Sequence, residues 1–352
     1  MANHVPGRGG ALVRFGLGVP TGTEGLMYPV PYADIDQAVE LAVTAERLGF
    51  ESIWGNDHLT TQRYVRAEFD RAPRYYDPFG YLSYVAAVTE RIRLATAVMV
   101  LPFRHPVVAA KQAATLDQLS RGRAVLGVGI GAYREELEAV EPGRKVHRGE
   151  HAEEAIPALR ALLSERSASF HGTWVEFTDV ESYPKPYRDR RLPILSGGNS
   201  PGSRSRAARY GDGWLPACLT PDEVRSALAA IAAEAAEHGR ELPADFEVAL
   251  QVAVSVAPTR DEAWRRFESS QVYKHLASLS RTTLKDQGTG DLAARNLIGT
   301  PDDVAAQVRA YRDAGVTTLA GLLFAVDTVE ETVDAMAGFS ETIIAAETKG
   351  SR

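Results

Sequence analysis

Short runs of branched apolar residues alternate along this chain with longer segments that carry apolar residues at helical spacing. The segment 92–101 is too rich in β-branched residues for a comfortable helix and is the clearest strand candidate. The other strand candidates are 13–19, 51–54, 124–129, 194–196, 214–217, 248–256 and 317–324. The helix candidates between the early strands are 35–48, 78–89 and 106–119. Eight strands that alternate with helices predict an α/β fold, the (β/α)8 TIM barrel.

Start signals for four further helices follow in the second half of the chain. Three threonines stand three residues before a glutamate, which is the spacing of a capping box. These pairs are Thr220 with Glu223, Thr259 with Glu262, and Thr328 with Glu331. Thr300-Pro301 is a fourth start, with proline at the first helical position. Helices are therefore expected beside the later strands as well.

The length of 352 residues suits one barrel domain with insertions, which we assign to residues 13–348. Residues 1–12 lack the apolar core of a secretory signal and are expected to form a loose N-terminal tail. The segments near 60–76, 170–186 and 269–296 exceed a minimal barrel, and the second is predicted to form a β-hairpin. Because barrel active sites form at the C-terminal ends of the strands, we expect these inserted loops to form a lid or a substrate wall.

The composition and charge of the chain argue against several classes of function. The charge balance, 39 − 46 = −7, argues against a nucleic-acid-binding surface, which would carry a basic excess. No uninterrupted apolar stretch is long enough to cross a bilayer, so no membrane association is expected. The single cysteine, Cys218, excludes an intrachain disulfide and favours a reducing, cytoplasmic location. The eight histidines are scattered along the chain, and no metal site is predicted.

A glycine pair connects the strand candidate 194–196 to the helical run that follows it. Gly197 and Gly198 let the backbone approach a ligand closely, while the first helical turn offers unpaired N–H groups and the positive end of its dipole. This arrangement favours the phosphate of a cofactor, although two glycines can also serve only as a tight turn. The residues assigned to this phosphate site are Ser196, Gly197, Gly198, Asn199 and Ser200.

Several motifs occur in a fixed order along most of the chain. They are Arg104-His105-Pro106, the segments 116–123 and 126–131, Gly197-Gly198, and the segment 211–214. Together they resemble the bacterial luciferase-like monooxygenase superfamily. The resemblance implies a barrel oxidoreductase that uses either FMN or the deazaflavin coenzyme F420 and acts on a small organic molecule. It also implies a homodimer that pairs through the helices near the second and third strands.

The second strand candidate is followed by Asp57-His58, which is similar to the deazaflavin-dependent branch, whereas FMN-dependent luciferases tend to carry Glu-His-His there. The resemblance implies that His58 exchanges a proton with the substrate. Asp57 is then expected to hydrogen-bond the cofactor ring or to fix the tautomer of the imidazole. By themselves, a strand-end aspartate can simply cap a loop, and a histidine can be a scaffold residue.

On the third strand the resemblance implies a non-proline cis peptide at Ala97–Val98, behind the cofactor ring. It also assigns Gly129 and Gly131, at the end of the fourth strand, to the cofactor site. An ordinary buried strand would explain the small and branched residues of the third strand equally well.

The loop after the fourth strand departs from one group of relatives. Ala132 stands where sugar-phosphate dehydrogenases of the deazaflavin branch carry a carboxylate, so that activity is not expected. Tyr133 is the neighbouring candidate for a proton donor or a stacking ring. Glu135 and Glu136 are expected to serve the dipole of the next helix, and Arg206 to face solvent.

The sequence therefore predicts an oxidoreductase that transfers a hydride between reduced coenzyme F420 and a small organic substrate. The first alternative is a two-component monooxygenase that uses O2 and reduced FMN supplied by a partner reductase. The second is a flavin-binding protein without catalytic activity, in which the phosphate site persists but the pocket does not work.

Overall fold

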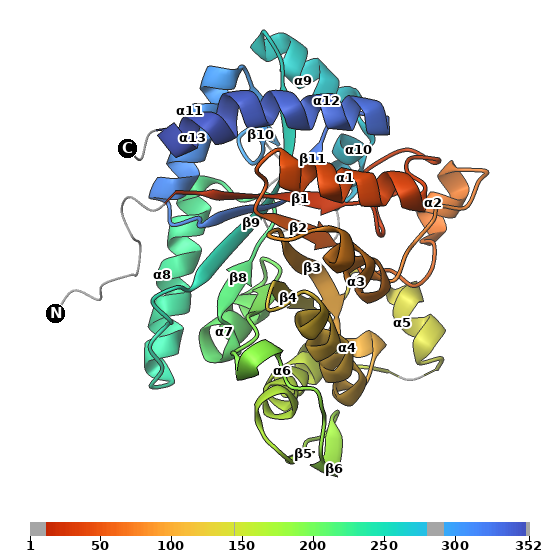
Figure 1. Ribbon diagram of the computed structural model, residues 1–352, viewed down its shortest axis with the longest axis vertical. Coiled ribbons are helices and arrows are strands. Elements are labelled where there is room, and N and C mark those ends of the chain that lie inside the picture. The colour runs from red at the N-terminus through yellow and green to blue at the C-terminus, as the bar shows by residue number, and fades with distance from the viewer. Residues whose placement is uncertain (1–11, 144, 280–291, 350–352) are drawn as a thin grey trace, which may run out of the picture.

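The computed structural model describes residues 12–143, 145–279 and 292–349 and confirms the predicted (β/α)8 barrel (Figure 1). Parallel strands follow one another in the order β11, β1, β2, β3, β4, β7, β8 and β9, and the parallel pairing of β9 with β11 closes the ring. The barrel strands are β1 (Arg14–Val19), β2 (Ser52–Gly55), β3 (Arg93–Val100), β4 (Ala124–Gly129), β7 (Ile194–Gly197), β8 (Gly213–Leu215), β9 (Glu247–Val256) and β11 (Thr318–Phe324).

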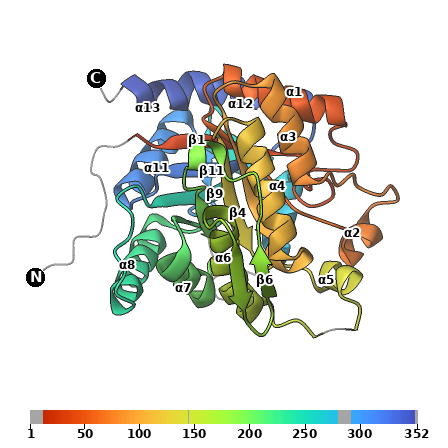
Figure 2. The ribbon, with the colours of Figure 1, turned by 60° about the horizontal axis from the view of Figure 1, so that its bottom comes forward.

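Helices cover the outside of the barrel (Figure 2). The capping boxes at Thr220, Thr300 and Thr328 form in both directions, whereas the hydroxyl of Thr259 accepts a bond without a reciprocal one among the described contacts. The helices are α1 (Ile35–Arg47), α2 (Arg63–Glu68), α3 (Pro78–Val88), α4 (Pro106–Leu119), α5 (Arg134–Val140), α6 (Arg148–Ser164), α7 (Pro201–Tyr210), α8 (Pro221–Glu237), α9 (Arg260–Ser269), α10 (Gln271–Leu279), α11 (Pro301–Asp313), α12 (Val329–Phe339) and α13 (Ala345–Lys349).

Additional elements lie in the segments that exceed a minimal barrel. The segment 60–76 contains α2, and β5 (Ala168–His171) pairs antiparallel with β6 (Glu176–Val180) to form a hairpin. The segment 269–296 contains α10, while its residues 280–291 lie outside the described part of the chain, as do residues 1–11 of the expected tail. A short strand, β10 (Leu297–Gly299), pairs with the C-terminal end of β9.

Charged side chains tie four strands together at the N-terminal end of the barrel. Glu247 of β9 is buried and forms a bidentate ion pair with Arg93 of β3, at 2.9 and 2.8 Å. Arg14 of β1 lies 3.1 Å from the same carboxylate, and the hydroxyl of Thr318 on β11 donates to it at 2.7 Å. A single buried carboxylate thus holds the beginnings of these strands in place.

The third strand is irregular near its C-terminal end. Its register with β4 shifts between Thr96 and Met99, and the Ala97–Val98 peptide bond is cis, as expected from the family resemblance. Val98 lies within this bulge. Of the helices in the described ranges, none combines the length and the apolar character needed to span a membrane.

Candidate active site

The C-terminal ends of the barrel strands surround a cavity of about 650 Å³, a volume typical of small-molecule sites. Most of the residues predicted for the site line this cavity: His58, Ala97, Val98, Gly129, Gly131, Tyr133, Gly197, Gly198, Asn199 and Ser200. Two of the predicted residues, Asp57 and Ser196, do not line it. The topology therefore brings together residues from four strands that are up to about 140 positions apart in sequence.

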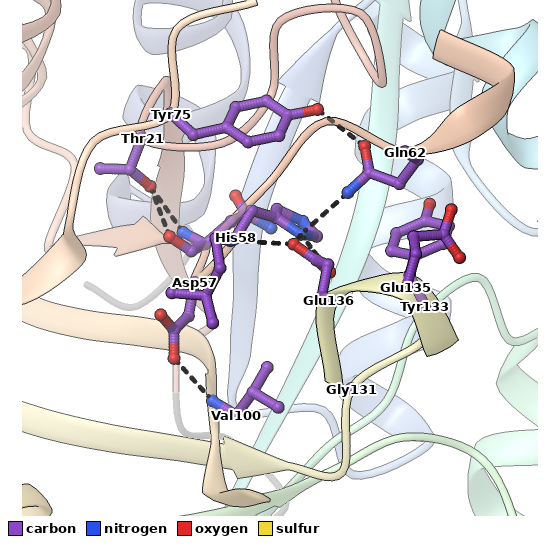
Figure 3. Close-up of polar contacts among 12 residues, drawn as sticks. Thr21, Asp57, His58, Gln62, Tyr75, Val100, Gly131, Tyr133, Glu135 and Glu136 are labelled. Carbon is purple, nitrogen blue, oxygen red and sulfur yellow. Dashed lines mark hydrogen bonds and ion pairs between the residues drawn. The ribbon is translucent and has the colours of Figure 1, made fainter. Parts of the chain in front are cut away.

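His58 presents its imidazole to the cavity with one ring nitrogen already engaged. Its Nδ1 lies 3.1 Å from both carboxylate oxygens of Glu136, on α5 (Figure 3). Because an ionised carboxylate only accepts hydrogen bonds, Nδ1 carries the hydrogen and Nε2 is left as the reactive atom. No group in the described parts of the chain hydrogen-bonds Nε2. The imidazole can therefore accept a proton at Nε2, or donate one when it is protonated.

Glu136 was expected to serve the dipole of α5; it lies in the first turn of that helix, and it also holds the imidazole of His58. Its side chain is 1 % exposed, and besides His58 it accepts a hydrogen bond from the backbone N–H of Leu59 at 2.9 Å. Glu136 thus fixes both the imidazole and the loop that carries it. The only sequence signal was its position just after the fourth strand, at the end of the barrel where active sites form.

The imidazole is also held by close packing. A Cβ atom added to Gly22 would lie 2.7 Å from Cδ2 of His58, so only glycine fits there without displacing the ring. The rings of Tyr75 and Tyr133 lie 5.5 and 5.8 Å from the imidazole, measured between ring centroids. The hydroxyl of Tyr75 donates to Gln62, whose amide lies beside the imidazole (Figure 3). His58 therefore has little freedom to rotate away from Glu136.

Asp57 does not take the role that was expected of it. The side chain is buried, accepts a bond from the backbone N–H of Val100 at 2.9 Å, and pairs with Arg104 at 2.8 Å. It therefore supports the end of β3 rather than a ligand, and Glu136 is the group that holds the imidazole (Figure 3). The alternative that a strand-end aspartate simply caps a loop describes this residue correctly.

Packing against Val98 requires glycine at two of the predicted site positions. A Cβ atom on Gly129 or on Gly197 would lie 2.5 Å from a methyl group of Val98. Gly198 instead adopts a φ of +108°, and Gly131 a φ of +74°, where side chains other than glycine are strained. The glycine pair therefore makes room for the β3 bulge and turns the chain toward α7, and both of its residues line the cavity.

The turn after β7 is stabilised by its own side chains. Asn199 exchanges two hydrogen bonds with the backbone of Ala217, and the hydroxyl of Ser200 caps α7 by accepting from the N–H of Ser203. Ser196 is buried and donates to the carbonyl of Ser203, which explains why it does not reach the cavity. The backbone N–H groups of Asn199 and Ser200 donate to no protein group in the described residues, so they remain available to an anion.

Two arginines line the cavity near this turn. Arg206 was expected to face solvent, but it is 5 % exposed and pairs with Glu153 of α6. Arg148 begins α6 and donates to the backbone carbonyl of Gly131 at 2.6 Å. Within the described residues Arg148 has no carboxylate partner, and burial lowers its pKa. Arg148 is thus a cation that can still bind an anionic ligand.

Side chains from three separate parts of the chain meet near His58. The hydroxyl of Tyr64, on α2, lies 3.2 Å from the hydroxyl of Tyr133 and 3.3 Å from Nδ1 of His275, on α10. Burial raises the pKa of Tyr133 well above its ordinary value, so this phenol stays protonated. Burial and the charge of His58 lower the pKa of His275 to about 4, so this imidazole is neutral at physiological pH.

Among the described residues, the cavity shows neither a metal-binding cluster nor a reactive thiol. The described residues contain no cluster of three or more histidine, cysteine or acidic side chains that could hold a metal ion. Cys218 lines the cavity, but burial raises its pKa to about 12, so the thiol stays protonated. The arrangement suits a bound organic cofactor and proton transfer through His58.

Known proteins share both the sequence pattern and the fold. Residues 10–318 match a family model described as luciferase-like monooxygenase. An F420-dependent glucose-6-phosphate dehydrogenase from Amycolatopsis mediterranei is 29% identical over 301 residues, which cover 80% of this chain and 86% of that protein. An FMNH(2)-dependent dimethylsulfone monooxygenase from Pseudomonas putida is 28% identical over 318 residues, 84% of this chain and 85% of that protein. The crystal structure of the monooxygenase RslO1 from Streptomyces bottropensis superposes with a TM-score of 0.75 at 24% identity, over 95% of this chain and 99% of that one.

Proposed function

This chain belongs to the luciferase-like monooxygenase family and is an oxidoreductase, and on that premise we propose that it transfers a hydride between reduced coenzyme F420 and a small organic substrate. The observation that carries the proposal is the histidine at the cavity. Nδ1 of His58 is held by Glu136, and its Nε2 is free for a substrate proton. A proton exchanged at a fixed imidazole is what hydride transfer to or from a carbonyl group requires.

The residues at the cavity fit a flat cofactor with a phosphate-bearing tail. Gly129, Gly131 and the β3 bulge make one wall low in side chains, which suits a planar ring. We assign the phosphate to the N-terminal turn of α7, where Asn199 and Ser200 offer N–H groups, and to Arg148. Reduced F420, when bound, would supply a hydride. Both F420 and FMN carry a phosphate on this kind of tail.

The protein's own residues perform the proton transfer in the proposed reaction. When a carbonyl carbon of the substrate accepts a hydride, the C–O π bond opens and the oxygen takes a proton from Nε2 of His58. Glu136 compensates the charge of the imidazolium before that step and keeps Nδ1 protonated after it. Tyr133, whose phenol stays protonated, can donate a second hydrogen bond to the same oxygen. In the reverse reaction Nε2 of His58 accepts the proton from the substrate hydroxyl.

A second candidate function is two-component monooxygenation with reduced FMN from a partner reductase. It is favoured by the similarity to the dimethylsulfone monooxygenase, which extends over as much of the chain as the similarity to the dehydrogenase. Asp57-His58, in place of Glu-His-His, supports F420 as the first choice. A cytoplasmic location remains our expectation, based on the single buried cysteine.

Direct binding decides between these functions. Oxidised F420 and FMN would be titrated into the protein and followed by fluorescence, and candidate carbonyl substrates would then be added to the protein with the reduced cofactor. F420 binding with substrate-dependent reoxidation and no oxygen uptake supports the proposal. FMN binding alone, with substrate-dependent oxygen uptake, supports the monooxygenase. Flavin binding without any substrate-dependent oxidation indicates the non-catalytic alternative.

Replacing Arg148 by methionine is expected to weaken the binding of the phosphate-bearing cofactor by about 10- to 100-fold, because a charge-assisted hydrogen bond is lost. The phosphate-free form of the same cofactor serves as the matched control, and its affinity should be equal for both proteins. Both dissociation constants are measured by fluorescence titration. An equal loss for the two ligands would place Arg148 beside the ring instead of the phosphate.

We also propose that the protein is a homodimer that pairs through α3 and α4. These neighbouring helices expose large apolar side chains to solvent: Tyr84 is 62 % exposed, Val108 51 % and Leu119 55 %. Large apolar side chains exposed on neighbouring helices support an association site there. Tyr84→Glu combined with Val108→Glu is expected to convert the dimer to a monomer, measured by light scattering after size exclusion. A wild-type protein that elutes as a monomer at high concentration would contradict the proposal.

A further inference from the structure

The cavity has two chemically different sides. Its polar side lies at the ends of β4 and β7, where the glycines, Arg148 and the turn before α7 are found. In the closed ring of eight strands, β4 and β7 lie across from β11 and β1. The residues that line the cavity on that opposite side, and on the adjoining β9 and α10, are Leu26, Met27, Val252, Ala253, Val272, Leu276, Leu279 and Leu323. We call these eight residues the apolar wall.

The apolar wall is a continuous surface. Val272, Leu276 and Ala253 belong to one buried apolar cluster, against which Met27 and Leu323 pack. Figure 1 shows α10 beside β11, on the side away from α6. The helix is held there by Gln271, which lies 3.5 Å from the carbonyl oxygen of Gly25, and by the contact of His275 with Tyr64. The wall is therefore part of the folded protein and needs no ligand to form.

The charged side chains that line the cavity lie on its polar side, opposite the apolar wall. Among the described lining residues, the formally charged side chains are Arg148 and Arg206, which both belong to the helices beside β4 and β7. Carboxylates are absent from the described lining. The polar groups near the apolar wall are Gln251 and His275, and burial keeps His275 neutral. An anionic substrate group placed against this wall would lose its hydration without gaining a cation.

Resting on the proposed function, we propose that the substrate is an uncharged, largely apolar molecule that binds against the apolar wall with its single reacting oxygen at Nε2 of His58. The polar side is then left to the phosphate-bearing cofactor. This inference separates the chain from an enzyme for sugar phosphates, whose anionic group needs a cation on the substrate side. Leu276 and Val272 of α10 become specificity-determining residues, because they supply the wall opposite the cofactor.

The test measures binding and does not depend on turnover. Straight-chain methyl ketones with four, six and eight carbons would be titrated calorimetrically into the protein saturated with its oxidised cofactor, and into the protein alone. Each added methylene group is expected to tighten binding by about fourfold, the effect of burying one CH2 group. Glucose 6-phosphate serves as the anionic probe and is expected to show no binding. Stronger binding of glucose 6-phosphate than of the ketones would overturn the proposal.

Leu276→Lys places a charge on the apolar wall and is expected to weaken binding of the eight-carbon ketone by at least about tenfold. Ser278→Lys adds the same residue to the same helix at an exposed position and is the matched control, with no expected change. If Leu276→Lys lowers the melting temperature, Leu276→Gln gives the same comparison without the charge. Unchanged ketone affinity in a folded Leu276 variant would overturn the assignment of the wall.

The outcomes separate this inference from the proposed function. Ketone affinity that rises with the number of carbon atoms, in a protein that binds neither F420 nor FMN, would contradict the proposed function and support the assignment of the apolar wall. Cofactor binding together with ketone affinity that is independent of chain length would remove the inference and leave the proposed function intact.

Discussion

Replacing His58 by glutamine is expected to lower kcat by about 10²- to 10⁴-fold, the usual contribution of a positioned acid or base. Glutamine can keep a hydrogen bond to Glu136 but cannot deliver a proton from the opposite end of the side chain. The Kd of the cofactor should change by less than about threefold, because the phosphate and ring contacts are assigned to other residues. Steady-state kinetics and fluorescence titration measure the two quantities on the same preparation. An unchanged kcat would exclude His58 from the reaction.

Glu136→Gln is the matched variant for the same experiment. Its amide can offer hydrogen atoms to Nδ1, which favours the tautomer with the hydrogen on Nε2 and leaves the imidazole unable to accept a proton there. A fall in kcat of about tenfold or more, at unchanged cofactor affinity, is expected by analogy with other histidines that lose a carboxylate partner. Glu135→Gln, on the same helical turn, is the control for a general effect of removing a charge, and its kcat should match the wild type.

Replacing Arg93 by methionine is expected to lower the free energy of unfolding by about 3–5 kcal/mol, because it leaves a buried carboxylate without its bidentate partner. Glu247 is held by Arg93 through two hydrogen bonds, while the remaining cation, Arg14, is partly exposed. Urea denaturation at neutral pH measures the change. The double variant Arg93→Met with Glu247→Gln should recover much of the loss, because a neutral amide is less costly to bury than an unpaired charge.

The same ion pair predicts a dependence on pH. Burial raises the pKa of Glu247, but the hydrogen bonds and charges of Arg93 and Arg14 outweigh it, so the net pKa lies below its ordinary value. Such a group stabilises the fold above its unfolded pKa, about 4.3, and the contribution is lost as the pH falls through the folded value. The wild type should therefore lose more stability than Arg93→Met on acidification below about pH 4. Equal losses would show that the pair does not contribute to acid stability.

Local patterns in the sequence were sufficient to predict the barrel architecture. Each barrel strand was located within a few residues, because a buried parallel strand is an apolar run whose character depends only on its own residues. The starts of α8, α9 and α12 were also visible from pairs of residues three positions apart, and the start of α11 from a proline at the first helical position. The end of the barrel that holds the cavity followed from the fold alone.

The interpretation of individual site residues needed the three-dimensional contacts. Asp57 and Glu136 are 79 positions apart, and the sequence assigned the imidazole to the nearer carboxylate. Arg206 was placed in solvent because its partner, Glu153, belongs to a different helix. At Gly197 the neighbour that excludes a side chain is Val98, which the sequence did not indicate. In each case the residue that determines the role is distant along the chain, and the spacing of residues in the sequence does not reveal such contacts.

The amino-acid sequence by itself determined the barrel, the end of it that holds the site, and the family, because these depend on periodicity and on short motifs. The tertiary structure alone decided which carboxylate holds His58, which cation at the cavity has no acidic partner among the described residues, and which wall is apolar. Those properties arise where loops from different strands meet. Hydrogen bonds and burial act over a few ångströms of space, whatever the separation of the residues along the chain.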